Sequence, residues 1–134
     1  MYHISSDKNL LQPERMLELL RMTYWASDRT AEQLALAVEN SVCFGAYLTE
    51  DGRQIGLVRV VTDYVSAFYV CDVVVDPAFR GMGVGKALLS RALSDGRYAH
   101  LRGLLVTSDA HGLYRQYGFT PANERHMGRE PGFC

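Results

Sequence analysis

Three glycines at alternate positions, in the segment Arg80-Gly81-Met82-Gly83-Val84-Gly85-Lys86, constrain the fold of this chain more than any other feature. An apolar run typical of a buried strand precedes the segment, and a helical pattern of apolar residues follows it. Glycine lets the backbone take unusual dihedral angles and approach a ligand closely. Because exposed amides at the start of a helix attract anions, the segment predicts a strand–loop–helix unit that binds phosphate groups. Arg80 and Lys86 add positive charge at its two ends.

Two common phosphate-binding patterns do not fit this segment. The P-loop requires a glycine where this chain has Arg80, and a serine or threonine where it has Ala87. The dinucleotide fingerprint requires its third glycine at position 86, but Gly85 comes one residue early. The strand before the segment is also expected to belong to an antiparallel meander rather than to open a parallel unit. Both classes of nucleotide site are therefore excluded.

The rest of the chain predicts alternating strands and helices around this unit. Pro13 suits the first turn of a helix, and Thr30 with Gln33 has the form of a capping box that starts a second one. The buried face of that second helix is expected to comprise Leu34, Ala35 and Val38. Strands are predicted near residue 4, over 42–48 and 54–62, from 66 or 67 to 75, and over 103–107. Helices are predicted over 13–20, 30–38, 84–95 and 110–117, and one or two edge strands within 119–134.

This order predicts the fold class. An Asp-Gly turn at residues 51–52 joins two of the strands in an antiparallel meander, and Pro77 ends its third strand. A strand–helix–strand crossover follows the meander. We therefore expect an α/β (α+β) domain with a mixed, mostly antiparallel central sheet flanked by about four helices, and a single domain over 1–134.

Size and charge exclude several kinds of protein. The chain has 134 residues, too few for a two-half dinucleotide-binding fold with a separate substrate domain. Its 14 Lys and Arg against 15 Asp and Glu give a net charge of −1, so no general basic field exists for a nucleic acid or a membrane surface. No apolar run spans a membrane, and no secretory signal is visible. We expect a cytoplasmic protein.

Cysteine and histidine spacing gives no metal site. Cys43, Cys71 and Cys134 form no CxxC pair, and the four histidines show no HxH or HExxH spacing. Cys43 and Cys71 lie in apolar runs and are expected to be buried reduced thiols.

Three motifs together resemble the GNAT superfamily of acyl-CoA N-acyltransferases. The glycine segment fits that family's [RQ]xxGx[GA] pattern, and the preceding Val73-Val74-Val75-Asp76-Pro77 is similar to its cofactor-binding strand. The later Ala110-His111-Gly112-Leu113-Tyr114-Arg115-Gln116-Tyr117-Gly118-Phe119 resembles the family's A…[FL]YxxxGF signature. The element order matches over essentially the whole chain, which implies the GNAT fold.

The resemblance implies sites for acetyl-CoA. Backbone groups of the strand are expected to bind the pantetheine, and the loop amides to bind the pyrophosphate. Tyr114 matches a tyrosine near the CoA sulfur and is the expected general acid, because a phenol can protonate a leaving thiolate. Tyr117, on the same helix, is either a packing residue or a further cofactor-site candidate. The expected cofactor-binding residues are Val73, Val74, Val75, Arg80, Gly81, Met82, Gly83, Val84, Gly85, Lys86, Tyr114 and Tyr117.

The general base and the acceptor site are less well defined. Asp72 stands in an apolar strand, where a raised pKa would suit a base, and it could equally bind amides at a bulge. Asp63, at a strand end, is the other candidate base, and could instead recognise a cationic amine. Tyr24, Trp25 and Arg29 lie between the first two helices, where this fold usually recognises its acceptor. Aromatic faces beside a carboxylate suit a cationic amine, although Trp25 could also simply fill the core.

We therefore expect an N-acetyltransferase that moves an acetyl group from acetyl-CoA to a primary amine, on a small molecule or a protein, directly within a ternary complex. No metal, nucleic acid or membrane is expected to bind. The expected oligomeric state is a monomer or homodimer. The alternative is a non-catalytic acyl-CoA-binding sensor or regulatory module, which would keep the loop but need no acid or base.

Overall fold

A computed structural model describes residues 1–121 and 125–132 of the chain. The elements follow in the order β1 (Tyr2–Ser5), α1 (Pro13–Arg21), α2 (Ala31–Glu39), β2 (Val42–Leu48), β3 (Gln54–Thr62), β4 (Ala67–Val75), α3 (Val84–Leu93), β5 (Arg102–Leu105) and α4 (His111–Arg115). Single 3₁₀ turns stand at Lys8–Leu10 and Pro77–Phe79. In the described ranges, no helix is long and apolar enough to span a lipid bilayer.

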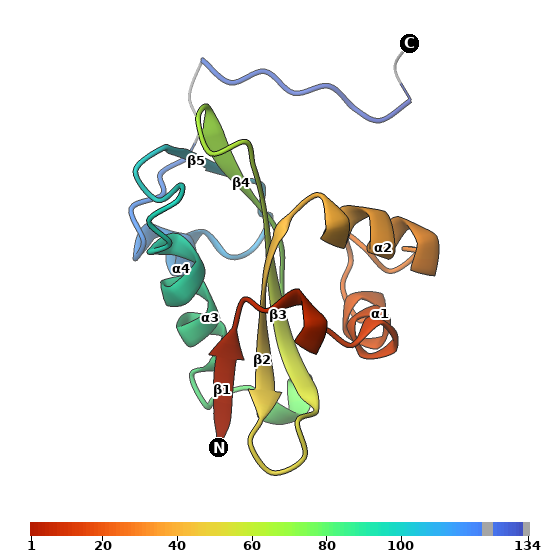
Figure 1. The fold of residues 1–134 in the computed structure, drawn as a ribbon. Helices are drawn as coiled ribbons and strands as arrows, with labels where there is room; N and C mark the ends of the chain where they lie inside the picture. Colours follow the sequence, from red (N-terminus) through yellow and green to blue (C-terminus); the bar gives the residue numbers. More distant parts are fainter. Residues whose placement is uncertain (122–124, 133–134) are drawn as a thin grey trace.

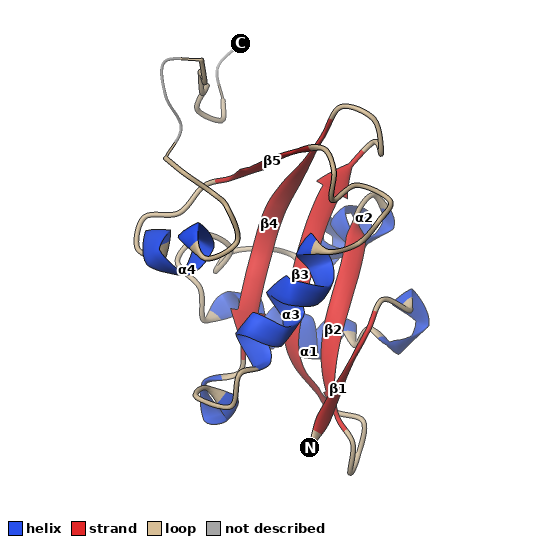
Figure 2. Ribbon diagram, turned by 90° about the vertical axis from the view of Figure 1, so that its left-hand side faces the viewer, coloured by secondary structure: helices blue, strands red, loops and turns tan. Residues whose placement is uncertain are grey.

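The strands form one five-stranded sheet in chain order (Figure 1). Strands β1 to β4 pair antiparallel, and β5 runs parallel to β4 after the crossover through α3. Helices α1 and α2 cover one face of this sheet, and α3 and α4 lie on the other (Figures 1 and 2). The predicted mixed, mostly antiparallel sheet with four flanking helices is confirmed.

Local signals account for the helix starts. Pro13 occupies the first turn of α1. The side chain of Thr30 accepts a hydrogen bond from the Gln33 amide, and the Gln33 side chain accepts one from the Thr30 amide, so the predicted capping box is formed. On α2, Leu34 is buried, but Ala35 is exposed, so the predicted buried face is narrower than expected.

A separate core fills each side of the sheet. Leu19, Leu20 and Leu34 pack from α1 and α2 against one face, and Leu88 and Leu89 of α3 pack against the other. Gly56 of β3 lets α3 come close, because a β-carbon there would lie 2.8 Å from the Leu88 side chain.

Strand β4 loses its regular pairing in its middle. Val60 pairs with Val70, but Arg59 pairs with Asp72, so Cys71 is an extra residue and forms a β-bulge. Strand β5 pairs only with Ala67 to Val70, on the far side of this bulge. Figure 2 shows β5 beside only one end of β4. Residues 71–75 therefore have a strand partner on one side alone within the described chain.

Three predictions about the later part of the chain are corrected. The helix predicted over 84–95 ends at Leu93, and the strand predicted over 103–107 is β5 at Arg102–Leu105. No strand forms in the described residues of the 119–134 segment, where one or two were expected. Residues 122–124 and 133–134 of that expectation lie outside the described residues.

Truncation of a core leucine on α3 tests the packing of this helix on the sheet. Leu88 is fully buried, so Leu88→Ala should lower the free energy of unfolding by about 2–5 kcal/mol through lost burial and a residual cavity. Leu36→Ala is the matched control, because Leu36 is 62% exposed on α2 and the change there should stay within about 0.5 kcal/mol. Denaturant unfolding measures both, and equal effects would contradict this packing.

Candidate active site

The glycine segment and the unpaired part of β4 line one cleft of about 750 Å³. The end of α1 and the α1–α2 connection form its opposite wall, and Asp109 and Leu113 border it from the β5–α4 side. The lining residues are Leu19, Met22, Thr23, Tyr24, Trp25, Val73, Val74, Val75, Pro77, Phe79, Arg80, Gly81, Gly83, Val84, Gly85, Lys86, Asp109 and Leu113. Most of the predicted cofactor residues are therefore brought together in one place.

The start of α3 offers unpaired backbone amides to this cleft. Gly83 is the N-cap residue, has φ +79°, and provides no side-chain cap. In the described chain, the N–H groups of residues 81–86 have no acceptor. A β-carbon on Gly81 or Gly83 would meet no atom within 4 Å, so the space before the loop is open. Amides at a helix N-terminus with open space before them suit an anion such as a diphosphate.

The free edge of β4 lies beside this loop. Because backbone groups of a strand point alternately to its two sides, about half of those in residues 73–75 point away from β3. Strand β5 has already diverged at this point, so no strand of the described chain pairs with them. An extended ligand with amide groups can bind there as an additional strand would.

Asp72, the residue after the bulge, is held by three donors. Arg59 Nε donates to Oδ2 at 2.8 Å and Arg29 Nη1 donates to the same oxygen at 2.9 Å. Trp25 Nε1 donates to Oδ1 at 2.9 Å. The Asp72 side chain is only 1% exposed. Burial alone would raise the pKa of Asp72, but the hydrogen bond and charge of Arg59 and the charge of Arg29 outweigh it and lower that pKa.

The raised pKa that would have suited Asp72 as a base does not occur. A carboxylate with a lowered pKa and both oxygens occupied is a poor proton acceptor, so the structure speaks against Asp72 as the base. The bulge alternative is partly right, since Asp72 adjoins the bulge but binds side chains rather than amides. Through Trp25 and Arg29, it attaches the α1–α2 connection to the sheet.

Asp63 lies in the β3–β4 turn, outside the cleft. Its carboxylate accepts hydrogen bonds from Ser66 Oγ at 2.6 Å, the Ser66 amide at 2.7 Å and the Val65 amide at 2.8 Å. The hydrogen bond from the Ser66 side chain, followed by those from the two amides, lowers the pKa of Asp63 to about 2. The structure thus gives Asp63 a role in its own turn and places it apart from the predicted acceptor residues.

The aromatic residues of the α1–α2 connection do reach the cleft. Tyr24 and Trp25 line it, with ring centroids 5.0 Å apart in an edge-to-face arrangement and exposed fractions of 63% and 42%. Tyr24 Oη accepts a hydrogen bond from Ser108 Oγ at 2.8 Å, which joins the connection to the β5–α4 loop. Arg29 does not line the cleft, because it turns to Asp72.

Tyr114 lines a second cavity of about 910 Å³ beside β5 and is not among the described residues that line the first cleft, although its neighbour Leu113 is. Burial raises the pKa of Tyr114, and the acidic groups of Tyr24 and Asp109, which line the cleft, raise it further. Its ring packs edge-on against Phe119, with centroids 6.1 Å apart. Tyr117 also faces the second cavity, and its hydroxyl donates to the Lys86 carbonyl at 3.2 Å, so it braces the end of the glycine loop.

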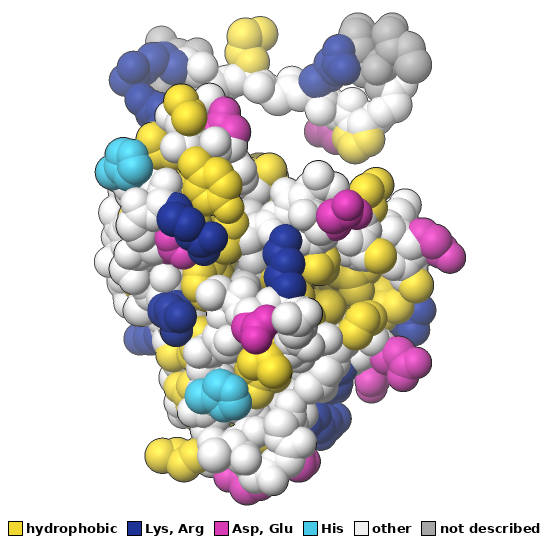
Figure 3. All heavy atoms as spheres, in the orientation of Figure 1, with side chains coloured by type: hydrophobic (Ala, Val, Ile, Leu, Met, Phe, Trp, Pro, Cys, Tyr) yellow, Lys and Arg dark blue, Asp and Glu magenta, His cyan; other side chains and the backbone are white. Residues whose placement is uncertain are grey.

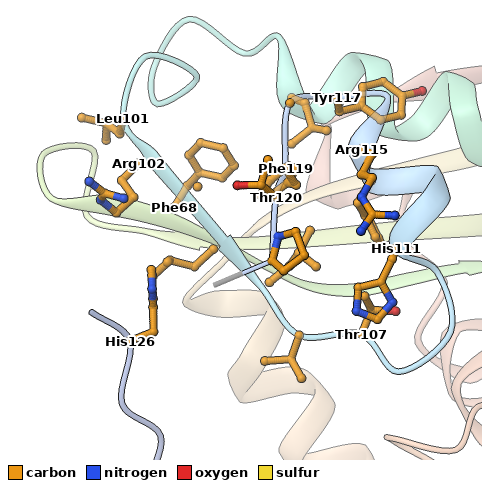
Figure 4. A pocket seen from close by; sticks show the side chains of 18 of the residues that line it. Phe68, Leu101, Arg102, Thr107, His111, Arg115, Tyr117, Phe119, Thr120 and His126 are labelled. Atoms are coloured by element: carbon orange, nitrogen blue, oxygen red, sulfur yellow. The ribbon is translucent and has the colours of Figure 1, made fainter. Parts of the chain in front are cut away.

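The second cavity lacks the features of a cofactor cleft. Figure 4 shows His111, Arg115 and His126 around it, together with Phe68 and Phe119. Neither the glycine loop nor the free edge of β4 reaches it.

Basic and acidic side chains are interspersed over the face of the molecule drawn in Figure 3. No group of His, Cys, Asp and Glu suited to a metal ion occurs in the described ranges.

Comparison with known proteins decides the family. A family model described as an acetyltransferase (GNAT) domain matches residues 39–121, more than half of the chain. The chain belongs to the GNAT acetyltransferase family. The matched region contains the bulge, the glycine loop and the Tyr114 helix, so the resemblance drawn from the three motifs is confirmed. Family membership makes this chain an N-acetyltransferase and acyl transfer its reaction class.

Individual GNAT relatives agree with this assignment. A Gibberella zeae protein named as an acetyltransferase is 33% identical, over 84% of this chain and 75% of its own length. A crystal structure of a GNAT family protein from Xanthomonas campestris pv. campestris is 39% identical, with a TM-score of 0.90 over 97% of this chain and 93% of that one. The chain spans about half the length of several other relatives.

A more distant structure shares the fold. It is a complex with a bisubstrate analogue, CoA-S-monomethyl-acetylneamine, and its protein is 19% identical with a TM-score of 0.70 over 97% of this chain and 98% of that one.

Within this GNAT site, Asp109 is the residue that the sequence patterns did not single out. It precedes the Tyr114 helix and is the one carboxylate among the residues that line the cleft. The only available signal was its position directly before the Ala110–Phe119 motif.

Removal of the buried carboxylate tests the anchoring role of Asp72. Asp72→Asn leaves Arg59 and Arg29 without their counter-charge, which should cost about 3–5 kcal/mol of unfolding free energy. Because the folded-state pKa of Asp72 is lowered, this contribution is complete above its unfolded pKa of about 3.9 and declines as the pH falls toward the folded value. Urea unfolding at several pH values measures it. Asp28→Asn, an exposed control on the same connection, should change little, and a pH-independent or negligible loss in Asp72→Asn would refute the role.

Proposed function

We propose that this GNAT chain transfers an acetyl group from acetyl-CoA directly to a primary amine within a ternary complex. The observation that carries the proposal is the juxtaposition, in one cleft, of the uncapped α3 amides and the unpaired edge of β4. Cytoplasmic location and a monomeric or homodimeric state stay predictions of the sequence.

The cleft has the right groups for CoA. The amides of residues 81–86 would hold the pyrophosphate, with Arg80 and Lys86 beside them, and the backbone of residues 73–75 would hold the pantetheine. Acetyl-CoA supplies a thioester whose carbonyl carbon an amine can attack. The complex of the distant neighbour with a CoA bisubstrate analogue supports this assignment by fold.

Tyr114 suits the role of general acid. Its raised pKa keeps the phenol protonated at neutral pH, so it can donate a proton to the sulfur as CoA leaves. Leu113, the residue before Tyr114, lines the cleft, and the acidic groups of Tyr24 and Asp109 on the cleft lining act on the Tyr114 phenol.

The cysteines favour direct transfer over a covalent enzyme intermediate. Burial raises the pKa of Cys43 to about 11 and also raises that of Cys71. The nucleophilic form of cysteine is the thiolate, which is scarce for both residues at neutral pH. Neither residue lines the cleft.

A pair of glycine variants separates cofactor binding from backbone strain. Gly83 and Gly52 have φ values of +79° and +75° with open space around them, so alanine at either position should cost about 1–2 kcal/mol of stability. Only Gly83→Ala disturbs the α3 amides, and it should weaken acetyl-CoA binding about tenfold or more in calorimetry. Equal affinities for the two variants would count against this loop as the pyrophosphate site.

A tyrosine variant tests catalysis. Tyr114→Phe should bind acetyl-CoA as the wild type does but release thiol from it about 100-fold more slowly with an amine panel, because the proton donor is lost. Tyr64→Phe, at an exposed tyrosine in the β3–β4 turn, is the control and should keep full activity. Unchanged turnover in Tyr114→Phe would remove it as the acid. Wild-type binding of acetyl-CoA without any turnover would favour the sensor alternative.

A further inference from the structure

Asp109 is the one acidic side chain among the described residues that line the cleft. It stands in the loop between β5 and α4, and every other charged residue on the cleft lining is basic, namely Arg80 and Lys86. Asp109 lines the cleft together with Leu113, the residue before the proposed proton donor Tyr114, and its acidic group acts on the Tyr114 phenol. The described lining of the cleft therefore has basic residues at the glycine loop and one acidic residue at the β5–α4 loop.

The carboxylate of Asp109 neither caps α4 nor orders its own loop in the described chain. Ala110, not Asp109, is the N-cap of α4, and no side chain caps that helix. Thr107 Oγ1 accepts the hydrogen bonds from the amides of Asp109 and Ala110, so the side chain of threonine, and not of aspartate, orders the loop. No hydrogen bond or ion pair involves the Asp109 carboxylate among the described residues, and the residue is exposed.

Tyr24 brings an aromatic wall to the same part of the cleft. The hydrogen bond from Ser108 Oγ to Tyr24 Oη connects the residue next to Asp109 with the α1–α2 connection. Trp25 lies edge-to-face with Tyr24, and the bond from its indole to Asp72 fixes its orientation. An unpaired carboxylate that lines the same cleft as two aromatic rings is a suitable environment for an alkylammonium group.

We propose that Asp109 binds the protonated amine of the acceptor and accepts the proton that makes it nucleophilic. This inference rests on the proposed function and names the missing base of that site. Asp72 and Asp63, the two carboxylates singled out by the sequence, are engaged elsewhere. The acceptor class is a primary alkylamine that arrives as an ammonium ion.

The proposed reaction accounts for both protons that the acceptor nitrogen loses. The ammonium gives one proton to Asp109 and becomes a neutral amine. The amine nitrogen then bonds to the acyl carbon as the carbon–sulfur bond breaks. The second nitrogen proton reaches the sulfur by way of Tyr114, which donates one proton and regains one. Asp109 finally releases its proton to solvent, so the products are a neutral amide, CoA thiol and one free proton.

A comparison of charged and uncharged nucleophiles tests this role. The assay measures thiol release from acetyl-CoA with n-butylamine, phenethylamine, spermidine and a lysine-containing peptide, which are all ammonium ions near neutral pH. Hydroxylamine, which is largely uncharged there, serves as the second kind of acceptor. Asp109→Asn should lower kcat/KM for the best ammonium acceptor about 100-fold while leaving that for hydroxylamine nearly unchanged. Asp109→Glu should restore part of the ammonium activity.

Equilibrium measurements separate this role from a structural one. Asp109→Asn should keep the melting temperature and the acetyl-CoA affinity of the wild type, and should weaken calorimetric binding of the best ammonium acceptor to the CoA-loaded protein. Asp28→Asn, an exposed carboxylate on the α1–α2 connection outside the cleft, is the matched control and should change none of these.

The outcomes test the role of Asp109 separately from the proposed function. A parallel loss with hydroxylamine and alkylamines, or no loss with either, overturns the role of Asp109 and leaves the proposed function intact. No thiol release by the wild type with any acceptor overturns the proposed function itself. The selective loss with ammonium acceptors supports both.

Discussion

Asp72 lies directly after the bulge that divides strand β4, and its buried carboxylate connects the two sides of the cleft. Arg59, its neighbour on β3, holds it within the sheet. Arg29 and Trp25 reach it from the α1–α2 connection, so the wall that faces the proposed acceptor is attached to the strand that faces the cofactor. A buried charge is tolerated only with such partners, because its desolvation would otherwise cost several kcal/mol. The shape of the cleft thus depends on this one carboxylate.

The bulge also divides β4 by function. Before Cys71 the strand pairs with β5 and belongs to the continuous sheet, and after it the outer edge is free to bind a ligand. The free edge leads into the 3₁₀ turn at Pro77–Phe79 and then to the uncapped start of α3. In the proposed function, backbone groups provide the cofactor side of the cleft, and side chains from the α1–α2 connection and the β5–α4 loop provide the acceptor side. In the proposed function, this separation lets acceptor residues vary without loss of the cofactor site.

The sequence predicted the parts of the structure that depend on local signals. The capping box of Thr30 and Gln33, Pro13 at the start of α1 and the glycines before α3 each act within one turn of chain, so their patterns are readable. The partners of Asp72 come from positions 25, 29 and 59, and only the folded sheet brings them together. The sequence could therefore not reveal that the pKa of Asp72 is lowered rather than raised. Sequence patterns did not single out Asp109, because its proposed role depends on the residues that the fold brings around it and not on a motif.

The central claim is that the cleft between β4 and the glycine loop, and not the larger cavity beyond β5, binds CoA. Backbone amide NMR during a titration with CoA tests it most directly, because it reports each residue separately. We expect the largest amide shifts in residues 73–75 and 81–86, where the free strand edge and the uncapped amides lie. Shifts confined to residues 102–105 and 115–120, around the second cavity, would contradict it.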